Sequence, residues 1–259
     1  AWPYTGGCHY TNDCDKYKTG CGRCPLIHSS DPSDISSEVI NSKKSHLPEG
    51  IRYIALSNWT AKQARSSYLL KNQSIDIILN SIDDTFLEAP DLNKEAIRKN
   101  LDIPQEKTII LAGAAKIDSI YKGYDELLPQ LTQLAEHNCH LVTFGNISDR
   151  LKTEIHINST HLGPLHSADE IRNLYHASDI FVAPSTQEAF GKTLAEAGAC
   201  GLPVVCYDIG GPRNIVVEGV SGYRTEVGQI NEFLNKILEL ATHSKKRESM
   251  GVEASRITR

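Results

Sequence analysis

Several features are missing from this sequence of 259 residues, and each absence excludes or disfavours a class of protein. No apolar run approaches the roughly 20 residues that a membrane-spanning helix needs. Basic residues are not in excess, because the formal net charge is −5, and this argues against a nucleic acid as the main partner. The dinucleotide-binding pattern G-x-G-x-x-G is also absent, which disfavours a nicotinamide-dependent oxidoreductase.

The remaining composition is that of an ordinary globular protein, with 40% hydrophobic and 23% charged residues. The length suits one large or two modest domains. No signal peptide is recognisable, which favours a cytoplasmic, reducing compartment.

Strand and helix patterns alternate from residue 51 to the end of the chain, after a loop-rich head (1–48) without any helical or strand period. Such alternation predicts an α/β fold with a parallel sheet covered on both faces. A Ser167–Glu170 capping box marks one helix start. The expected strands are 51–56, 75–79, 108–112, 140–144, 161–162, 180–183 and 204–207, and the clearest expected helices are 58–70, 93–100 and 230–241.

The most informative stretch is 184–205, which carries two glutamates, Glu188 and Glu196. Glu188 follows an apolar strand, and parallel sheets keep their ligand crevices at the carboxyl ends of strands. A helix then begins at Gly191, so free backbone N–H groups near Lys192 could bind a phosphate. Two carboxylates flanking an anion site suit a ligand with hydroxyl groups at both ends and phosphates between them, as in a nucleotide sugar.

Two alternative interpretations of this stretch are possible from the residues alone. The glutamates could be ordinary surface charges. Glu196, however, lies near the apolar stripe of its helix, which includes Thr193 and Leu194, and this favours a functional role. A phosphate-binding loop ending in Gly191-Lys192-Thr193 is rejected, because Thr186 stands where that pattern needs glycine.

The stretch resembles the E-x7-E signature of GT-B glycosyltransferases, specifically the large retaining family 4, also called group 1. Further segments resemble the family's motifs in the family's order, and the resemblance covers roughly residues 50 to 240. These segments are Asn80-Ser81-Ile82-Asp83 with Phe86, Leu111-Ala112-Gly113 with Lys122-Gly123, His161-Leu162-Gly163-Pro164-Leu165, and Gly210-Gly211 with Gly222-Tyr223.

The resemblance implies a GT-B fold, in which two Rossmann-like domains flank the active site. Residues 1–88 would be the incomplete end of the amino-terminal, acceptor-side domain, and 89–259 the carboxyl-terminal domain that binds the nucleotide sugar. On this expectation the chain is a fragment without most of its first sheet. The family's final helix, which crosses back to the first domain, would be missing or cut short.

The resemblance also assigns roles to individual residues. Lys122 matches the family lysine that reaches the donor's diphosphate, helped by backbone N–H groups at Phe190-Gly191-Lys192. Ala114 stands where the family usually has an arginine, so Lys116 is the candidate replacement. Glu196 would bind the ribose hydroxyls. Glu188 would bind the transferred sugar and stabilise positive charge at its anomeric carbon. Thr193, at the same helix start, completes the predicted donor site.

The implied activity is transfer of a sugar from a nucleotide-sugar donor to a glycan or lipid-linked acceptor, with retention of configuration. Its setting would be bacterial surface polysaccharide synthesis, in the cytoplasm or at the inner membrane face, with no cofactor for catalysis. Gly210-Gly211 would let backbone approach the sugar closely, although an ordinary turn explains these glycines equally well. A GT-B nucleotide-sugar epimerase and an inactive zinc-stabilised binding fragment are the alternative functions.

Four cysteines in the head, Cys8, Cys14, Cys21 and Cys24, form the second notable feature. Their C-x5-C-x6-C-x2-C spacing could hold a structural zinc ion that orders a loop without a core of its own. Disulfides and free thiols remain alternatives. The head resembles one seen in some bacterial surface polysaccharide transferases of this family. The other cysteines, Cys139, Cys200 and Cys206, lie in apolar segments and are expected to pack in the core.

Overall fold

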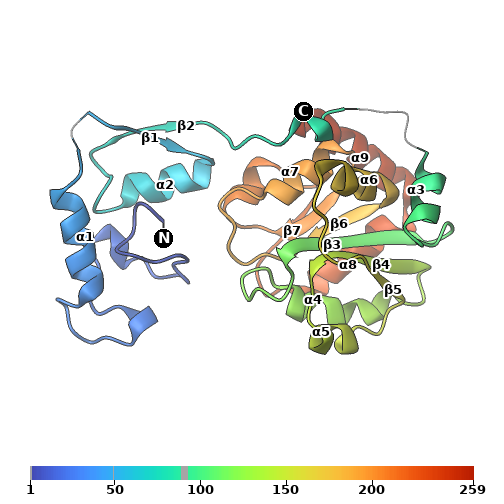
Figure 1. Cartoon of the computed structure of the whole chain (residues 1–259), viewed down its shortest axis with the longest axis horizontal. Helices are drawn as coiled ribbons and strands as arrows, with labels where there is room; N and C mark the ends of the chain where they lie inside the picture. The colour runs from blue at the N-terminus through green and yellow to red at the C-terminus, as the bar shows by residue number, and fades with distance from the viewer. Residues whose placement is uncertain (1, 49, 89–92) are drawn as a thin grey trace. The chain divides into compact units, whose positions relative to one another are not determined.

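A computed structural model describes residues 2–48, 50–88 and 93–259. The chain divides into two compact units, Ala1–Asn80 and Ser81–Arg259 (Figure 1). The predicted domain boundary after residue 88 adjoins residues 89–92, which lie outside the described residues.

In its described residues, the smaller unit contains a two-stranded parallel sheet and two α-helices. Its core includes Tyr17, Ile40, Ala61 and Ile75, all less than a tenth exposed. The elements are α1 (Ile35–Ser45), β1 (Arg52–Ala55), α2 (Asn58–Ser66) and β2 (Ser74–Ile77), with short 3-10 turns at Lys16–Lys18 and Pro25–Ile27.

Helix α1 corrects the prediction that the head has no regular structure. Asp34 caps the helix by accepting hydrogen bonds from the backbone N–H groups of Ser36 and Ser37. Only Ile40 of this helix is buried, so its sequence shows almost no apolar period. The Asp34 cap, the burial of Ile40 and polar contacts such as that of Lys43 Nζ with the Thr5 carbonyl oxygen at 2.8 Å stabilise a helix that hydrophobic periodicity alone cannot reveal.

The larger unit is built around a six-stranded parallel sheet in the order β5-β4-β3-β6-β7-β8. Helices α4, α5 and α8 contribute to one apolar core cluster, whereas α6 and α7 contribute to a second one on the opposite face. The sheet therefore lies between two helical layers. The strands are β3 (Thr108–Lys116), β4 (Cys139–Asn146), β5 (Ser159–His161), β6 (Ile180–Ala183), β7 (Val204–Tyr207) and β8 (Gly222–Thr225).

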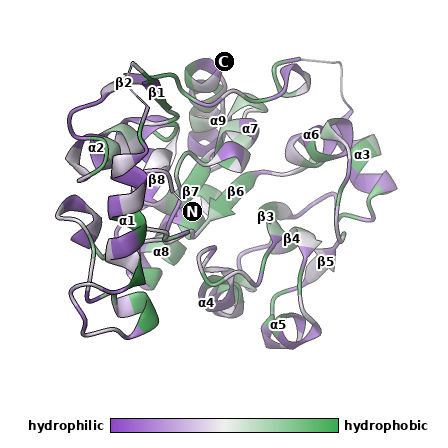
Figure 2. Cartoon of the chain, turned by 60° about the vertical axis from the view of Figure 1, so that its left-hand side comes forward, coloured by the Kyte–Doolittle hydropathy of each residue, from purple (hydrophilic) through white to green (hydrophobic). Residues whose placement is uncertain are grey.

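Strands β6 and β7 are buried at every residue, and Figure 2 shows both as hydrophobic. This is the pattern of strands covered on both faces. The helices are α3 (Lys94–Asn100), α4 (Tyr124–Gln130), α5 (Asp149–Glu154), α6 (Ala168–Ala177), α7 (Lys192–Ala199), α8 (Ile230–Thr242) and α9 (Ser244–Thr258), with 3-10 turns at Asp84–Phe86, Leu131–Leu134 and Gly211–Asn214.

The order of the strands reverses direction between β3 and β6. From β3 the chain passes outward through β4 and β5, then returns to β6 and continues outward on the other side. Ligands of open α/β sheets bind at the carboxyl ends of strands beside such a switch point. The segments that follow β3 and β6 carry Lys122 and Glu188, respectively, so the topology places both predicted residues at this point.

The last helix returns to the segment that precedes α3. Arg259, at the end of α9, donates hydrogen bonds to the carbonyl oxygens of Leu87 at 2.7 Å and Ala199 at 3.2 Å. Gly251 of α9 lies so close to Gly201 that a Cβ atom there would come within 2.2 Å of the Gly201 carbonyl oxygen. Close backbone packing therefore holds α9 against the end of α7.

Candidate donor site

An ion pair connects the two predicted residues at the switch point. Lys122 Nζ lies 2.7 Å from Glu188 Oε2, and the two side chains are 30% and 19% exposed. Lys122 belongs to the turn between β3 and α4, whereas Glu188 belongs to the loop between β6 and α7. Partial burial makes the attraction stronger than that of a surface pair. The free protein thus holds one positive and one negative group at the same place, with access to solvent.

Backbone contacts join the loops that carry these residues. The N–H of Thr186 donates to the carbonyl oxygen of Tyr121 at 2.9 Å, and the N–H of Gly211 donates to that of Glu188 at 3.0 Å. A Cβ atom on Gly211 would lie 2.2 Å from Phe190 Cα, which no ordinary contact permits. Glycine is therefore required at position 211, because only a residue without a Cβ atom can pack this closely against the backbone of the loop that carries Glu188. The loops after β3, β6 and β7 form one connected group.

Tyr124 connects the two strands that precede the loops of Lys122 and Glu188, and the sequence did not identify it as a functional residue. Its buried hydroxyl lies 3.1 Å from the N–H of Gly113 and 2.9 Å from the carbonyl oxygen of Val182. Accepting from the first and donating to the second, it joins the ends of β3 and β6. Burial raises the pKa of Tyr124, so the hydroxyl remains protonated. The sequence shows only an aromatic residue after Lys122-Gly123.

Glu196 lies within helix α7, with its side chain only 10% exposed. Its Oε2 atom is 3.3 Å from the hydroxyl of Tyr175, and Lys192 Nζ is 4.0 Å from Oε1. Burial raises the pKa of the Glu196 carboxyl, while Lys192 and the Tyr175 hydrogen bond partly oppose that rise and Asp83 adds to it. A buried carboxylate held on one side is suited to accept hydrogen bonds from a ligand.

The amino terminus of α7 begins at Gly191, which has a φ angle of +99°. Within the described part of the chain, no side chain caps this terminus. Gly191, at the cap position, has no side chain that could accept hydrogen bonds from the first backbone N–H groups, those of Lys192 and Thr193. The helix dipole adds positive potential at the same place. Phe190, just before it, is buried at 7% exposure. The arrangement is compatible with an anionic ligand at the start of α7.

Comparison with known proteins identifies the family of this chain. The family model described as "Glycosyl transferases group 1" matches residues 93–256, well over half of the chain. The chain belongs to this family. The D-inositol 3-phosphate glycosyltransferase of Xylanimonas cellulosilytica is 35% identical over 140 residues, which are 50% of this chain and 33% of that protein. The chain spans about half the length, or less, of the longest-matching curated relatives.

Solved structures agree on the fold. A glycosyltransferase from Rickettsia africae has a TM-score of 0.74 at 22% identity, covering 84% of this chain and 61% of the other. Anabaena HepE in complex with UDP-glucose has a TM-score of 0.71 at 20% identity, covering 86% and 62%. These likenesses confirm the predicted α/β fold with a Rossmann-like parallel sheet and GT-B neighbours.

Lys116 and Gly210 are two predicted residues that make no described hydrogen bond or ion pair with Lys122 or Glu188. Lys116 is the exposed last residue of β3, and among the described residues no hydrogen bond or ion pair links it to Lys122 or Glu188. Gly210 precedes the 3-10 turn Gly211–Asn214 and has a φ angle of +24° and a ψ angle of −122°. The backbone conformation of the turn accounts for the glycine at position 210. The side chain of Lys116 is exposed, and no described contact joins it to Lys122 or Glu188.

The structure does not support the zinc site predicted for Cys8, Cys14, Cys21 and Cys24. Among the residues described, no three histidine, cysteine or acidic side chains are placed to hold a metal ion. All four cysteines are free thiols. Burial and the three neighbouring cysteines raise the pKa of Cys8, which favours the neutral thiol. The head also has the core that the zinc hypothesis assumed to be missing, since Tyr4, Tyr17 and Ile40 pack within it.

The other three cysteines, Cys139, Cys200 and Cys206, are buried in the larger unit, as predicted.

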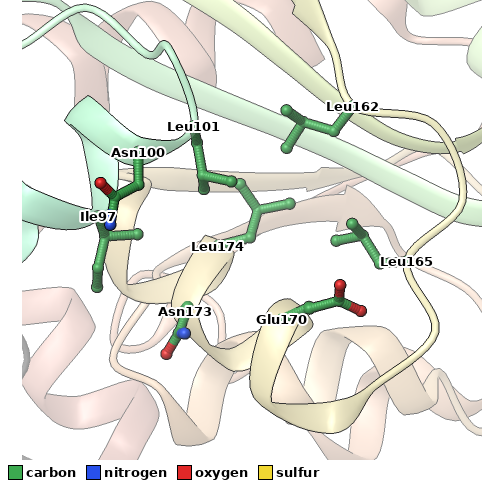
Figure 3. Close-up of a pocket in the computed structure, with 8 residues that line it drawn as sticks. All are labelled: Ile97, Asn100, Leu101, Leu162, Leu165, Glu170, Asn173 and Leu174. Atoms are coloured by element: carbon green, nitrogen blue, oxygen red, sulfur yellow. The ribbon is translucent and has the colours of Figure 1, made fainter.

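A cavity of about 170 Å³ lies beside α3 and α6 (Figure 3). Its lining includes Leu101, Leu162, Leu165 and Leu174 but none of the predicted donor-site residues. In the described portions of the chain, no helix has the length and apolar character needed to cross a membrane.

Proposed function

We propose that this group 1 chain binds a nucleotide-sugar donor at the switch point and transfers the sugar to an acceptor. The observation that carries the proposal is the ion pair between Lys122 and Glu188, with Glu196 held on the adjoining helix. Lys122 and the backbone N–H groups at the start of α7 would bind the diphosphate, with Lys116 as a further cation. Glu196 would accept hydrogen bonds from the ribose hydroxyls.

The Lys122–Glu188 pair suggests how the chemistry proceeds. In the free protein, each group neutralises the other. A donor diphosphate would compete for Lys122 and leave Glu188 beside the sugar, where its negative charge stabilises the positive charge that develops at the anomeric carbon. The Gly210-Gly211 turn would complete the wall of the sugar site. In this proposal the reaction retains anomeric configuration, and no metal or cofactor takes part.

Residues 1–88 would belong to the acceptor-side domain and 89–259 to the donor domain. The acceptor would be a glycan or a lipid-linked glycan of a bacterial surface polysaccharide, met in the cytoplasm or at the inner face of the membrane. The family membership supports glycosyl transfer, and Anabaena HepE in complex with UDP-glucose makes a uridine diphosphate sugar the first donor to test.

A panel of nucleotide sugars tests the proposal. The protein would be incubated with UDP-, GDP- and ADP-linked sugars, with and without glycan acceptors, and release of the nucleoside diphosphate measured. We expect one donor to be consumed, with release stimulated by acceptor. Isomerisation of a nucleotide sugar without release of diphosphate would instead indicate an epimerase.

The Glu196→Gln variant tests the ribose contact. A ribose contact contributes equally to ground and transition states, so we expect the donor KM to rise about 10-fold with kcat little changed. In the wild type, donor affinity should fall as pH decreases through the Glu196 pKa, because the protonated carboxyl is a weaker acceptor. Burial raises that pKa, so the fall should begin at a higher pH than for an ordinary glutamate. Steady-state kinetics from pH 4.5 to 8, a range that begins just above the usual glutamate pKa of about 4.3, would measure both effects. An unchanged KM would contradict the ribose role.

A further inference from the structure

The side chain of Tyr175 is held rigidly beside the candidate donor site. Its ring, on α6, is fully buried. Phe86, Phe144 and Phe181 contact it in edge-to-face geometry, with ring centroids 6.0, 6.2 and 5.7 Å away. Aromatic pairs in this geometry add stability beyond simple burial. The ring therefore has one well-defined position, and so does its hydroxyl group.

That hydroxyl reaches α7 at two points. It lies 3.3 Å from Glu196 Oε2 and 3.3 Å from the carbonyl oxygen of Thr193. Burial, followed by the nearby Glu196 charge, raises the pKa of Tyr175 well above its usual value, so the hydroxyl stays protonated and can donate. Its proton is available to the carboxylate of Glu196.

The other charged groups around Glu196 cannot fix its orientation equally well. Lys192 Nζ is 4.0 Å from Oε1, beyond hydrogen-bond distance, and its side chain is 56% exposed. Asp83, before the Asp84–Phe86 turn, has the same sign of charge and acts by repulsion. Tyr175 supplies the buried donor that these neighbours do not.

We propose that Tyr175 is a positioning residue that orients the Glu196 carboxylate for the ribose hydroxyls of the donor. The hydroxyl holds Oε2 and thereby presents Oε1 to the ligand. This inference rests on the ribose role proposed above for Glu196. Tyr175 does not touch the donor itself, so its effect should appear only where the carboxylate makes a contact.

The test compares two ligands in the Tyr175→Phe variant. Calorimetric titration with UDP should show about 10-fold weaker binding than in the wild type, the scale of one lost hydrogen bond to a charged group. Titration with 2′,3′-dideoxy-UDP, which has no ribose hydroxyls for Glu196, should show the same affinity in both proteins. If the wild type prefers GDP or ADP, the corresponding pair replaces UDP.

The pH dependence gives a second readout. The Tyr175 hydrogen bond lowers the Glu196 pKa, so its loss should raise that pKa and move the weakening of UDP binding to higher pH. Incorporating 3-fluorotyrosine at position 175 keeps the ring and supplies a stronger donor. It should shift the profile the opposite way, and it serves as the test if the phenylalanine variant does not fold.

Tyr223→Phe is the matched control. The Tyr223 hydroxyl also donates to a carboxylate, Glu239 Oε1 at 2.9 Å, and its ring is only 4% exposed. This variant should bind UDP normally. Equal loss of UDP and dideoxy-UDP binding in Tyr175→Phe, or no loss of either, would overturn the positioning role. Failure of the wild type to bind any of the three nucleotides would instead overturn the donor site, and the Tyr175 inference with it.

Discussion

Replacing Glu188 with glutamine is expected to lower kcat about 100-fold or more while changing the donor KM little. Glutamine keeps the shape and hydrogen-bonding capacity of the side chain but removes the negative charge. That charge matters most when the bond between sugar and phosphate breaks, because positive charge then develops at the anomeric carbon. Single-turnover measurement of sugar transfer, with donor in excess of KM, isolates this step.

The same substitution releases Lys122 from its ion pair with Glu188. Any small change in donor affinity should be toward tighter binding, since an unpaired Lys122 would attract the diphosphate more strongly. A Lys122→Gln variant is the control, and it should raise KM instead. The opposite pattern, a near-normal kcat in Glu188→Gln and a large loss in Glu196→Gln, would mean that the two glutamates have exchanged roles.

Gly211→Ala is expected to reduce transfer by at least 10-fold, because the added methyl group would displace the loop that carries Glu188. Its Cβ would lie 2.2 Å from Phe190 Cα, 2.4 Å from Phe190 N and 2.5 Å from the Ala189 carbonyl oxygen. All three are backbone atoms, so a side-chain rotation cannot relieve the clash. A displacement of about 1 Å at a reacting group is enough for a large loss of rate.

Activity and thermal unfolding should both be measured for this variant. Gly228→Ala is the comparison, since nothing lies within 4 Å of its Cβ position although its φ angle of +84° strains any other residue. Gly228→Ala should lose some stability and keep its activity. Wild-type activity in Gly211→Ala would show that the loop around Glu188 need not be held in place.

The sequence predicts the place of a candidate-site residue in the fold wherever that place depends on residues close by in the chain. The apolar run of β6 places Glu188 at a strand end, and Gly191 marks the start of α7. The capping box at Ser167 and Glu170 is present as predicted, with the Ser167 hydroxyl accepting from the Glu170 N–H. These features depend on neighbours within a few residues, which a sequence displays directly.

Other parts depend on contacts between distant segments and could not be predicted. Tyr175 looks like a core residue of α6, and only the packed structure brings its hydroxyl to Glu196, 21 positions away. Strand β8 and helix α1 have too few apolar residues in period to be recognised.

A crystal structure of the protein with the nucleotide sugar selected by the panel would test the central claim most directly. We expect Glu196 to lie within about 3.2 Å of a ribose hydroxyl and Lys122 within about 3.2 Å of a diphosphate oxygen. The sugar should lie against Glu188, and Lys122 should have moved from its 2.7 Å contact with that residue. A nucleotide bound elsewhere, such as the leucine-lined cavity beside α3 and α6, would contradict the assignment.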